Sequence, residues 1–355
     1  MNSLLHMFLN TVYIYSMTNP PPYAELTCIS NFSFLTGASH PQELVARAAE
    51  LGYSAIAITD ECSLAGVVRA LEEAQRSAAR GQPIRLIPGS SFRLENGSRL
   101  VLLPCDHNGY TQICTLITHG RRRAPKGEYN LPDRCFEHGL DHCLAVWLPA
   151  DENDVLTAHW LTAYFPDRCW MGLSLHLGPD DAKRRERLMA TARTAGLPVT
   201  ACGDVQMHIR SRRMLHDLLA AIRHGCTLEQ LGFRTLPSGE RHLRSREHLA
   251  QLFPRPLLEE STMIAGRCHF RLEQLNYRYP REVVPEGMSA IEHLSALTEA
   301  GIRKRWAQEP GRELRAQIEK ELQLIGELHY EPYFLTVHDI VRFAKSRGIL
   351  CQGRG

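Results

Sequence analysis

The last four residues, Gln352-Gly353-Arg354-Gly355, have the types and spacing that could hold a phosphate group. They follow a short apolar run, Ile349-Leu350-Cys351, which predicts a buried strand. A strand that leads into a Gly-rich, basic turn can cradle an anion, because backbone N–H groups approach closely where no Cβ intervenes. Gly-Arg-Gly alone is more often just a turn. Because a domain does not normally end inside its phosphate loop, we expect the chain to be the front part of a longer protein.

Histidine, carboxylate and cysteine side chains give weaker candidates for chemistry. His138, Asp141 and His142 could bind a metal, but Gly139 breaks the helix that would align them, so a solvated loop is the simpler interpretation. The eleven cysteines are odd in number and never form C-x-x-C. We therefore expect neither a disulfide framework nor a zinc knuckle, and we expect a reducing, cytoplasmic location.

Composition sets wide bounds on the kind of protein. The 355 residues suffice for two domains, and 44% apolar with 23% charged side chains is ordinary for globular proteins. Because 41 basic residues balance 39 acidic ones, no overall positive field indicates nucleic acid. The apolar stretch Leu4–Tyr15 is too short to span a bilayer and lacks the flanks of a signal peptide, so we expect no membrane association.

The elements that must position these residues follow from apolar runs and Gly or Pro breaks. Residues 23–205 alternate strand-like and helix-like segments, which favours an α/β barrel or a layered sheet. A capping box at Ser39–Gln42 and a type I′ turn at Asn96-Gly97 are among the local predictions. The predicted strands are Tyr23–Ile29, Tyr53–Thr59, Ile84–Ile87, Phe92–Leu94, Leu100–Leu103, Leu144–Leu148, Met171–Leu177 and Leu197–Ala201.

The rest of the chain is mainly helical, and it divides at a polar stretch. Helices are predicted over Arg212–His224, Arg246–Phe253, Leu257–Arg267, Ala290–Trp306, Glu313–Leu328 and Thr336–Arg347. Asn276–Pro285 is the best boundary candidate. We therefore predict a disordered or mis-assigned extension at residues 1–22, a barrel domain at 23–275, and a second, truncated domain at 276–355.

Several long motifs resemble one family. Tyr23–Ser39 and Ala57–Glu61 resemble the opening of the PHP (polymerase and histidinol phosphatase) domain, which heads the bacterial family C replicative polymerases. The resemblance implies an α/β fold, namely a distorted (β/α)₇-type barrel, followed by a mainly helical segment that leads into the polymerase palm. Four segments narrow the resemblance to the error-prone polymerase III α-subunit paralogues, namely Gly37–Pro41, Arg121–Tyr129, Ala201–Arg213 and Tyr330–Gly355.

A PHP phosphoesterase holds two or three metal ions with His, Asp and Glu at the ends of barrel strands, and a metal-activated water attacks the phosphoester. Measured against that pattern, the ligand set is eroded. Only Asp60, Glu61 and Asp204 retain ligand chemistry, and we expect Asp60 and Asp204 to cap turns or accept backbone hydrogen bonds instead of binding metal. Other residues stand where the resemblance implies ligands, namely Thr27, Ile29, Ser91 and Gln206.

The resemblance strengthens the prediction that the terminal loop binds phosphate. It implies that Gly353, Arg354 and Gly355 bind the triphosphate of the incoming nucleotide. Polymerisation also needs two divalent metals, Mg²⁺ in the full-length protein, held by aspartates that the family places downstream of this loop. We therefore expect the full-length protein to be an error-prone, DNA-directed DNA polymerase in damage-tolerant synthesis. We expect this chain alone to be inactive and to have no bound metal.

The resemblance also implies partners and leaves alternatives open. DNA and deoxynucleoside triphosphates would be substrates, and the sliding clamp and a translesion accessory protein are expected partners. The basic runs Arg121–Arg123 with Lys126, and Lys183–Arg187, could contact phosphates or be solvated faces. The alternative functions are a metal-dependent PHP-family phosphoesterase, which intact His-x-His and Asp-x-His pairs would support, and a scaffold that braces the polymerase or docks a partner.

Overall fold

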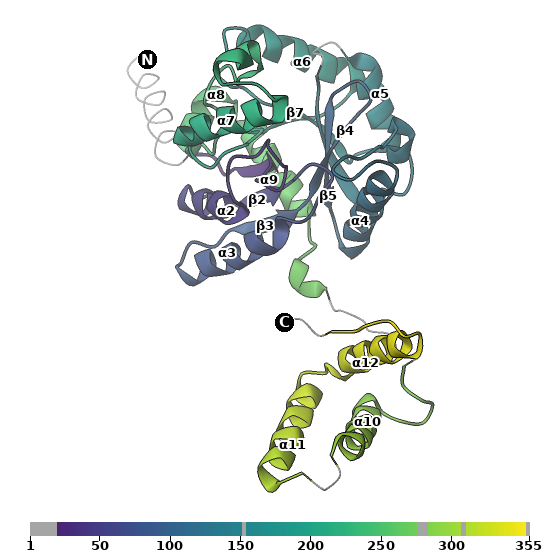
Figure 1. Cartoon of the computed structure of the whole chain (residues 1–355). Helices are drawn as coiled ribbons and strands as arrows, with labels where there is room; N and C mark the ends of the chain where they lie inside the picture. Colours follow the sequence, from purple (N-terminus) through teal and green to yellow (C-terminus); the bar gives the residue numbers. More distant parts are fainter. Residues whose placement is uncertain (1–19, 151–153, 276–282, 307–309, 353–355) are drawn as a thin grey trace, which may run out of the picture. The chain divides into compact units, whose positions relative to one another are not determined.

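The computed structural model describes residues 20–150, 154–275, 283–306 and 310–352. The predicted extension at residues 1–22 lies almost wholly outside these ranges. Contacts between Cα atoms divide the chain into two units, Met1–Gln274 and Leu275–Gly355 (Figure 1).

The first unit alternates strands with helices. Its strands are β1 (Ala24–Cys28), β2 (Ala55–Ile58), β3 (Arg85–Pro88), β4 (Ser90–Arg93), β5 (Arg99–Pro104), β6 (Cys143–Leu148), β7 (Cys169–Leu173) and β8 (Val199–Ala201). Its α-helices are α2 (Pro41–Glu50), α3 (Val67–Ala79), α4 (His107–Arg122), α5 (Val155–Tyr164), α6 (Asp181–Ala195), α7 (Arg213–His224), α8 (Arg246–Leu252) and α9 (Arg255–Arg267). Short 3₁₀ turns are η1 (Asp133–Phe136), η2 (Arg210–Arg212), η3 (Glu229–Arg234) and η4 (Leu272–Gln274).

The strands close into a ring. β1, β2 and β3 pair in parallel, and β4 to β8 form a second sheet in which β5 runs antiparallel to both neighbours. Only Gly89 separates β3 from β4, and Ser91 N donates to Asp60 O at 3.1 Å, so the pairing with β2 continues across that residue. Val205 N, just after β8, donates to Thr27 O at 2.9 Å and joins the last strand to β1. The predicted distorted (β/α)₇-type barrel is thus confirmed, and the reversed β5 is its distortion.

Gly89 has a steric reason at the bend between β3 and β4. A Cβ placed there would lie 2.8 Å from Leu102 O and 2.8 Å from Leu103 Cδ2 on the neighbouring β5. Such distances are too short for any side chain. Glycine therefore lets one strand serve two sheets and keeps the ring closed.

Two apolar layers hold the barrel. One cluster takes residues from strands all around the ring, such as Leu26, Ala57 and Val146, and includes Ile264 and Ala265 of α9. Because its members come from every side, this cluster fills the interior, and α9 packs against it through Ile264 and Ala265. A larger cluster packs the outer strand faces against the surrounding helices. The mouth residues therefore stand on a rigid frame.

Two local predictions are wrong in detail. The hairpin of β4 and β5 forms, but among Asn96 and Gly97 only Gly97 has positive φ, so the turn is not type I′. Helix α2 has His40 as its N-cap residue, and Glu43 Oε2 accepts from His40 N at 2.8 Å. Ser39 was expected to be the N-cap residue, but its Oγ lies 2.8 Å from His208 Nδ1. A residue distant in the sequence therefore takes the hydroxyl that would have capped the helix.

The second unit contains three described α-helices, α10 (Ala290–Arg305), α11 (Arg312–Glu327) and α12 (Glu331–Ser346). The predicted strand Ile349–Cys351 does not form. Leu350 is 95% exposed, and the described residues of this unit include no strand that could pair with it. A short apolar run needs such a partner to become a strand. Within the described part of the whole chain, no helix combines the length and apolar character needed to cross a membrane.

Candidate functional site at the barrel mouth

Asp60 anchors the loop that follows β1. It lies just beyond β2, and its side chain is almost fully buried. Its Oδ1 accepts from Ser30 N at 2.7 Å and from Ser33 Oγ at 2.7 Å, and its Oδ2 accepts from Ser30 Oγ at 2.7 Å. Burial raises the pKa of Asp60, while the serine hydrogen bonds oppose that shift. The carboxylate therefore has its acceptor sites filled by protein donors.

Asp204 forms the strongest electrostatic feature of the mouth. Its side chain is 5% exposed, Arg99 Nη2 lies 2.5 Å from its Oδ1, and Arg241 Nη1 lies 2.5 Å from its Oδ2. Burial alone would raise the pKa of Asp204, but the charges of Arg241 and Arg99 outweigh it and hold the pKa well below its usual range. The expectation that Asp204 caps a turn or accepts backbone hydrogen bonds is wrong, because two guanidinium groups contact its carboxylate oxygens.

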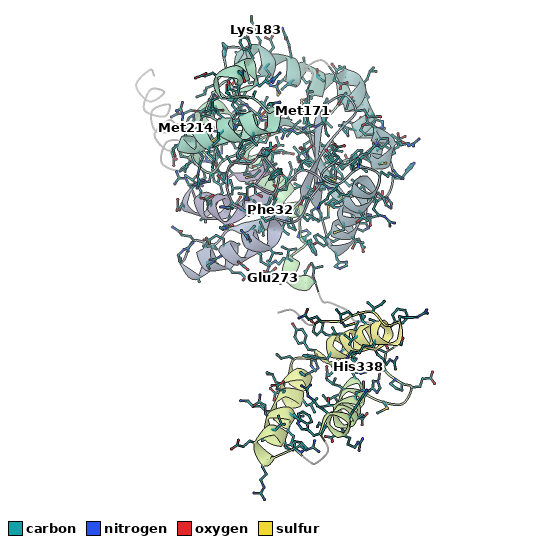
Figure 2. The ribbon with its side chains drawn as sticks, viewed as in Figure 1. Phe32, Met171, Lys183, Met214, Glu273 and His338 are labelled. Carbon is teal, nitrogen blue, oxygen red and sulfur yellow. The ribbon has the colours of Figure 1, made fainter. Side chains whose placement is uncertain are left out.

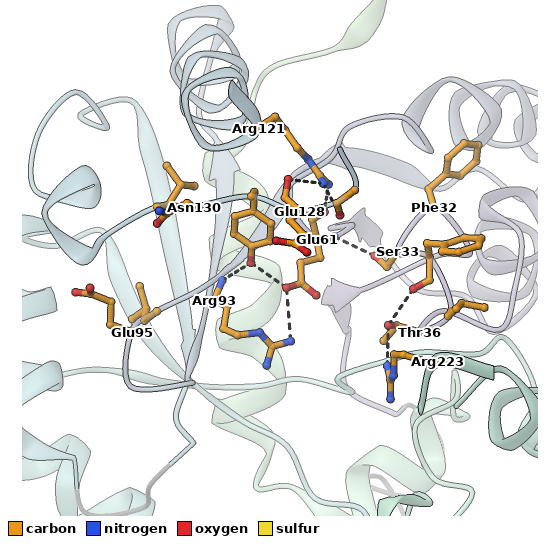
Figure 3. Close-up of a pocket in the computed structure, with 16 residues that line it drawn as sticks. Phe32, Ser33, Thr36, Glu61, Arg93, Glu95, Arg121, Glu128, Asn130 and Arg223 are labelled. Carbon is orange, nitrogen blue, oxygen red and sulfur yellow. Dashed lines mark hydrogen bonds and ion pairs between the residues drawn. The ribbon is translucent and has the colours of Figure 1, made fainter. Parts of the chain in front are cut away.

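Glu61 belongs to a different group of contacts. Tyr129 donates its hydroxyl to Glu61 Oε1 at 2.8 Å, and Arg93 Nη2 lies 3.5 Å from the same oxygen. Glu61 lines an open cleft of about 1040 Å³ at the mouth, and Figure 3 shows it close to Arg93. The carboxylates of Asp60, Asp204 and Glu61 therefore each have a different set of partners.

The residues in the eroded positions are also engaged. Thr27 Oγ1 accepts from Asp204 N at 3.1 Å, and Gln206 Oε1 lies 2.8 Å from His216 Nε2. Ser91 pairs through its backbone with Asp60, and Ile29 through its backbone with Val205. The side chains of Thr27 and Gln206 are thus held by hydrogen bonds, whereas Ser91 and Ile29 join neighbouring strand ends through their backbones.

The site does not fit a divalent metal. Two arginines already neutralise Asp204, and a cation would have to displace them. Asp60 would have to give up its serine donors. Within the described residues, no group of three or more His, Cys, Asp or Glu side chains is arranged to hold a metal ion.

Sequence reasoning did not single out three residues that the structure places at the mouth, namely Arg99, Arg241 and His176. Arg99 begins β5, Arg241 follows a Ser-Gly-Glu turn, and they lie 105 and 37 residues from Asp204 along the chain. His176 follows β7, and burial, followed by the charge of Arg241, lowers its pKa to about 4. A histidine soon after a buried strand could have been noticed, since strand ends meet at the barrel mouth. Nothing in the sequence marks the two arginines.

The other predicted clusters lie elsewhere. His142 Nδ1 lies 2.7 Å from Asp106 Oδ2, and His138 packs edge-on against Tyr164, so neither joins Asp141 in a metal site. The two basic runs differ in how their side chains are engaged. Arg121 donates to backbone carbonyls of Glu61, Cys62, Gly127 and Glu128. Lys183 is exposed at the outer edge of α6 (Figure 2).

The three residues of the candidate phosphate loop, Gly353, Arg354 and Gly355, lie outside the described residues. Gln352, the last described residue, follows α12 and its exposed terminal segment. The proposed nucleotide-binding role of the loop therefore stays a prediction.

The closed ring and its eroded mouth define a PHP-type α/β barrel. Residues 25–166 match the PHP domain family, and residues 292–355 match the bacterial DNA polymerase III alpha NTPase domain. The two matches occur in the order that the sequence motifs predict. The chain thus carries a PHP domain ahead of a polymerase III α-subunit segment.

Curated relatives narrow the family. An error-prone DNA polymerase of Methylococcus capsulatus is 55% identical over 334 residues, covering 94% of this chain and 31% of that protein. Error-prone DNA polymerases of Pseudomonas aeruginosa and Dechloromonas aromatica are 53% and 48% identical, again over 94% of this chain, covering 32% and 33% of those proteins. These relatives confirm the resemblance to error-prone polymerase III α-subunit paralogues. The chain spans about a third of their length.

Among solved structures, an amidohydrolase from Chromobacterium violaceum aligns with a TM-score of 0.40 and 13% identity, covering 52% of this chain and 88% of that one. A likeness at this level says nothing about function.

Proposed function

We propose that this chain is the N-terminal portion of an error-prone, DNA-directed DNA polymerase that acts in damage-tolerant DNA synthesis. The observation that supports this most is the 55% identity to an error-prone DNA polymerase over 94% of the chain. Because the chain spans only about a third of such relatives, the activity, the DNA and the deoxynucleoside triphosphates belong to the full-length protein in this proposal. A cytoplasmic location follows from the same assignment.

Within that polymerase, the barrel acts as a structural domain and not as a phosphoesterase. The pairing of Asp204 with Arg99 and Arg241 supports this role, as do the serine hydrogen bonds that fill Asp60. Metal-assisted hydrolysis needs carboxylates that are free to coordinate. No contact at the mouth favours the phosphoesterase alternative.

In the full-length protein, the loop Gly353–Gly355 would bind the triphosphate of the incoming nucleotide, with Arg354 supplying the charge. The supporting observation is the motif itself, placed after the segment Tyr330–Cys351. Two Mg²⁺ ions would assist the transfer, held by aspartates outside this chain. The sliding clamp and a translesion accessory protein remain proposed partners.

Primer extension tests the proposal. We expect no template-directed extension by the 355-residue chain at any Mg²⁺ concentration, and extension by the full-length protein. Arg354→Ala in the full-length protein should lower kcat/KM for the incoming nucleotide roughly 10- to 150-fold, because a charge-assisted phosphate contact contributes about 1.5–3 kcal/mol. Lys345→Ala, which removes a cation in the last turn of α12 and outside the loop, is the matched control and should leave kcat/KM within about twofold. A full-length protein without polymerase activity would refute the assignment.

A further inference from the structure

Helix α7 carries an apolar face that the described residues leave uncovered. Met214, Leu218 and Ile222 recur every four residues and therefore lie along one side of the helix. They are 82%, 45% and 57% exposed. The next turn, η3, adds Phe233, which is fully exposed. Exposed apolar side chains gathered along one side of a helix are a candidate interaction site. We call the side chains of Met214, Leu218 and Ile222 the α7 face.

The packing of α7 makes this exposure informative. Ala220 and Ala221 of α7 are buried against Leu231 of η3, so the helix is already anchored to the domain by other positions. The three exposed side chains are therefore not needed to hold α7 in place. Figure 2 shows Met214 at the periphery of the barrel unit, where a partner can reach it.

The surroundings of the α7 face are basic. Residues 210–234 contain five arginines against one aspartate and one glutamate, a net charge of +3, whereas the whole chain carries only +2. Arg210, Arg212 and Arg213 have acidic partners. Arg223 and Arg234 are exposed, and no acidic partner for either is found among the described residues. Two uncompensated cations thus lie on the segment that carries the apolar face.

The C-terminal end of α7 reaches the mouth cleft through Arg223. Arg223, at the end of α7, donates to Thr36 Oγ1 at 2.9 Å, and both residues line the cleft with Phe32 and Phe34 (Figure 3). Phe34 is 81% exposed. The loop Phe32–Thr36 therefore adds an aromatic edge beside the C-terminal end of α7.

We propose that the α7 face is a docking site for an amphipathic helix of a separate protein, with large apolar residues along one side and Asp or Glu on its flanks. A helix presents such residues at the same spacing of four as Met214, Leu218 and Ile222, so the two rows can interlock. Its flanking carboxylates would meet Arg223 and Arg234. A second copy of this chain is disfavoured because it would bring the same arginines together. Nucleic acid is disfavoured as the partner because the side chains of the α7 face are apolar and offer no hydrogen-bond donors to phosphate groups.

Fluorescence anisotropy with two designed peptides tests this directly on the 355-residue chain. Both are labelled 18-residue helices with Leu at every fourth position, one with Glu and the other with Lys at the flanking positions. We expect the Glu peptide to bind at least tenfold more tightly than the Lys peptide, and salt should narrow the difference. Equal binding of the two peptides, or no binding of the Glu peptide at millimolar concentration, overturns the proposal.

Variants locate the site. Met214→Asp should weaken binding of the Glu peptide at least tenfold, whereas Leu156→Asp should not change it. Leu156 is the matched control because it is 84% exposed and lies on α5, away from α7 (Figure 1). Arg234→Gln tests the charge with little risk to folding and should weaken binding several-fold. Unchanged binding in both Met214→Asp and Arg234→Gln refutes the site, as does full displacement of the peptide by single-stranded DNA. None of these measurements depends on polymerase activity.

Discussion

Replacing Asp204 by asparagine should destabilise the barrel unit by about 3 kcal/mol at neutral pH. The substitution keeps the shape and one hydrogen-bonding oxygen but removes the charge that Arg99 and Arg241 contact at 2.5 Å. Removing one partner of a buried ion pair costs roughly 3–5 kcal/mol, because the remaining charge is left uncompensated. The two arginines are 22% and 25% exposed, so water partly solvates them and the lower end of that range applies.

Urea unfolding followed by circular dichroism measures this difference. A loss of about 3 kcal/mol corresponds to a fall of roughly 6–12 °C in the thermal midpoint of a domain this size. Asp141→Asn is the matched control, since Asp141 is exposed and should stay within about 0.5 kcal/mol of the parent. Arg99→Gln and the double variant complete a cycle that isolates the pair.

The sign of the pH dependence gives a second check on the same variant. The folded-state pKa of Asp204 lies below its unfolded value, so its stabilising contribution is complete above about pH 4 and is lost as the pH falls further. The gap between parent and Asp204→Asn should therefore shrink in acid. A gap under 1 kcal/mol at pH 7, or one that widens as the pH falls, would refute the ion-pair argument.

Three further outcomes follow from the mouth and the frame. Elemental analysis should find no stoichiometric Zn²⁺ or Mn²⁺ in the purified chain; two or more metals per chain, lost in Asp60→Ala, would contradict this. His176 has a pKa of about 4, below its unfolded value near 6.5, so stability should fall by about 3 kcal/mol as the pH drops through that window. His176→Gln should flatten that slope in pH-dependent unfolding, and an unchanged slope would exclude His176 as its source. Gly89→Ala should lower stability by about 1–3 kcal/mol because its Cβ meets β5, whereas Gly266→Ala, with open space around it, should not.

The sequence predicts most of the first unit because its elements have local causes. The run Leu197–Ala201 predicts β8 at Val199–Ala201, and the helix predicted over Arg212–His224 is α7 at Arg213–His224. Prediction failed where the cause is distant. Ile349–Cys351 has the composition of a strand but no described strand to pair with, and Ser39 loses its capping role to a contact with His208.

The mouth shows the same division between local and distant causes. Asp60 follows a predicted strand, and its serine donors lie on the loop after β1, so a capping role could be inferred from a polar side chain at a strand end. The partners of Asp204 could not be inferred, because Arg99 lies 105 residues away and only the closed ring brings the start of β5 to the same mouth as the end of β8. Sequence reasoning therefore pointed to Asp60 and Asp204 but not to Arg99 and Arg241, the cations that pair with Asp204.

Those cations explain how a buried carboxylate persists in a mouth that does not fit a metal. An unpaired carboxylate at the 5% exposure of Asp204 would lose its hydration with nothing in return and would take up a proton. Two guanidinium groups supply the positive charge at that point, and they come from elements that the ring brings together. Asp60 is held differently, by neutral donors, and burial accordingly raises its pKa where that of Asp204 is lowered. The two acids nevertheless act alike, since each fixes a loop to the barrel rim, and rigidity there suits the structural role that we propose for the barrel.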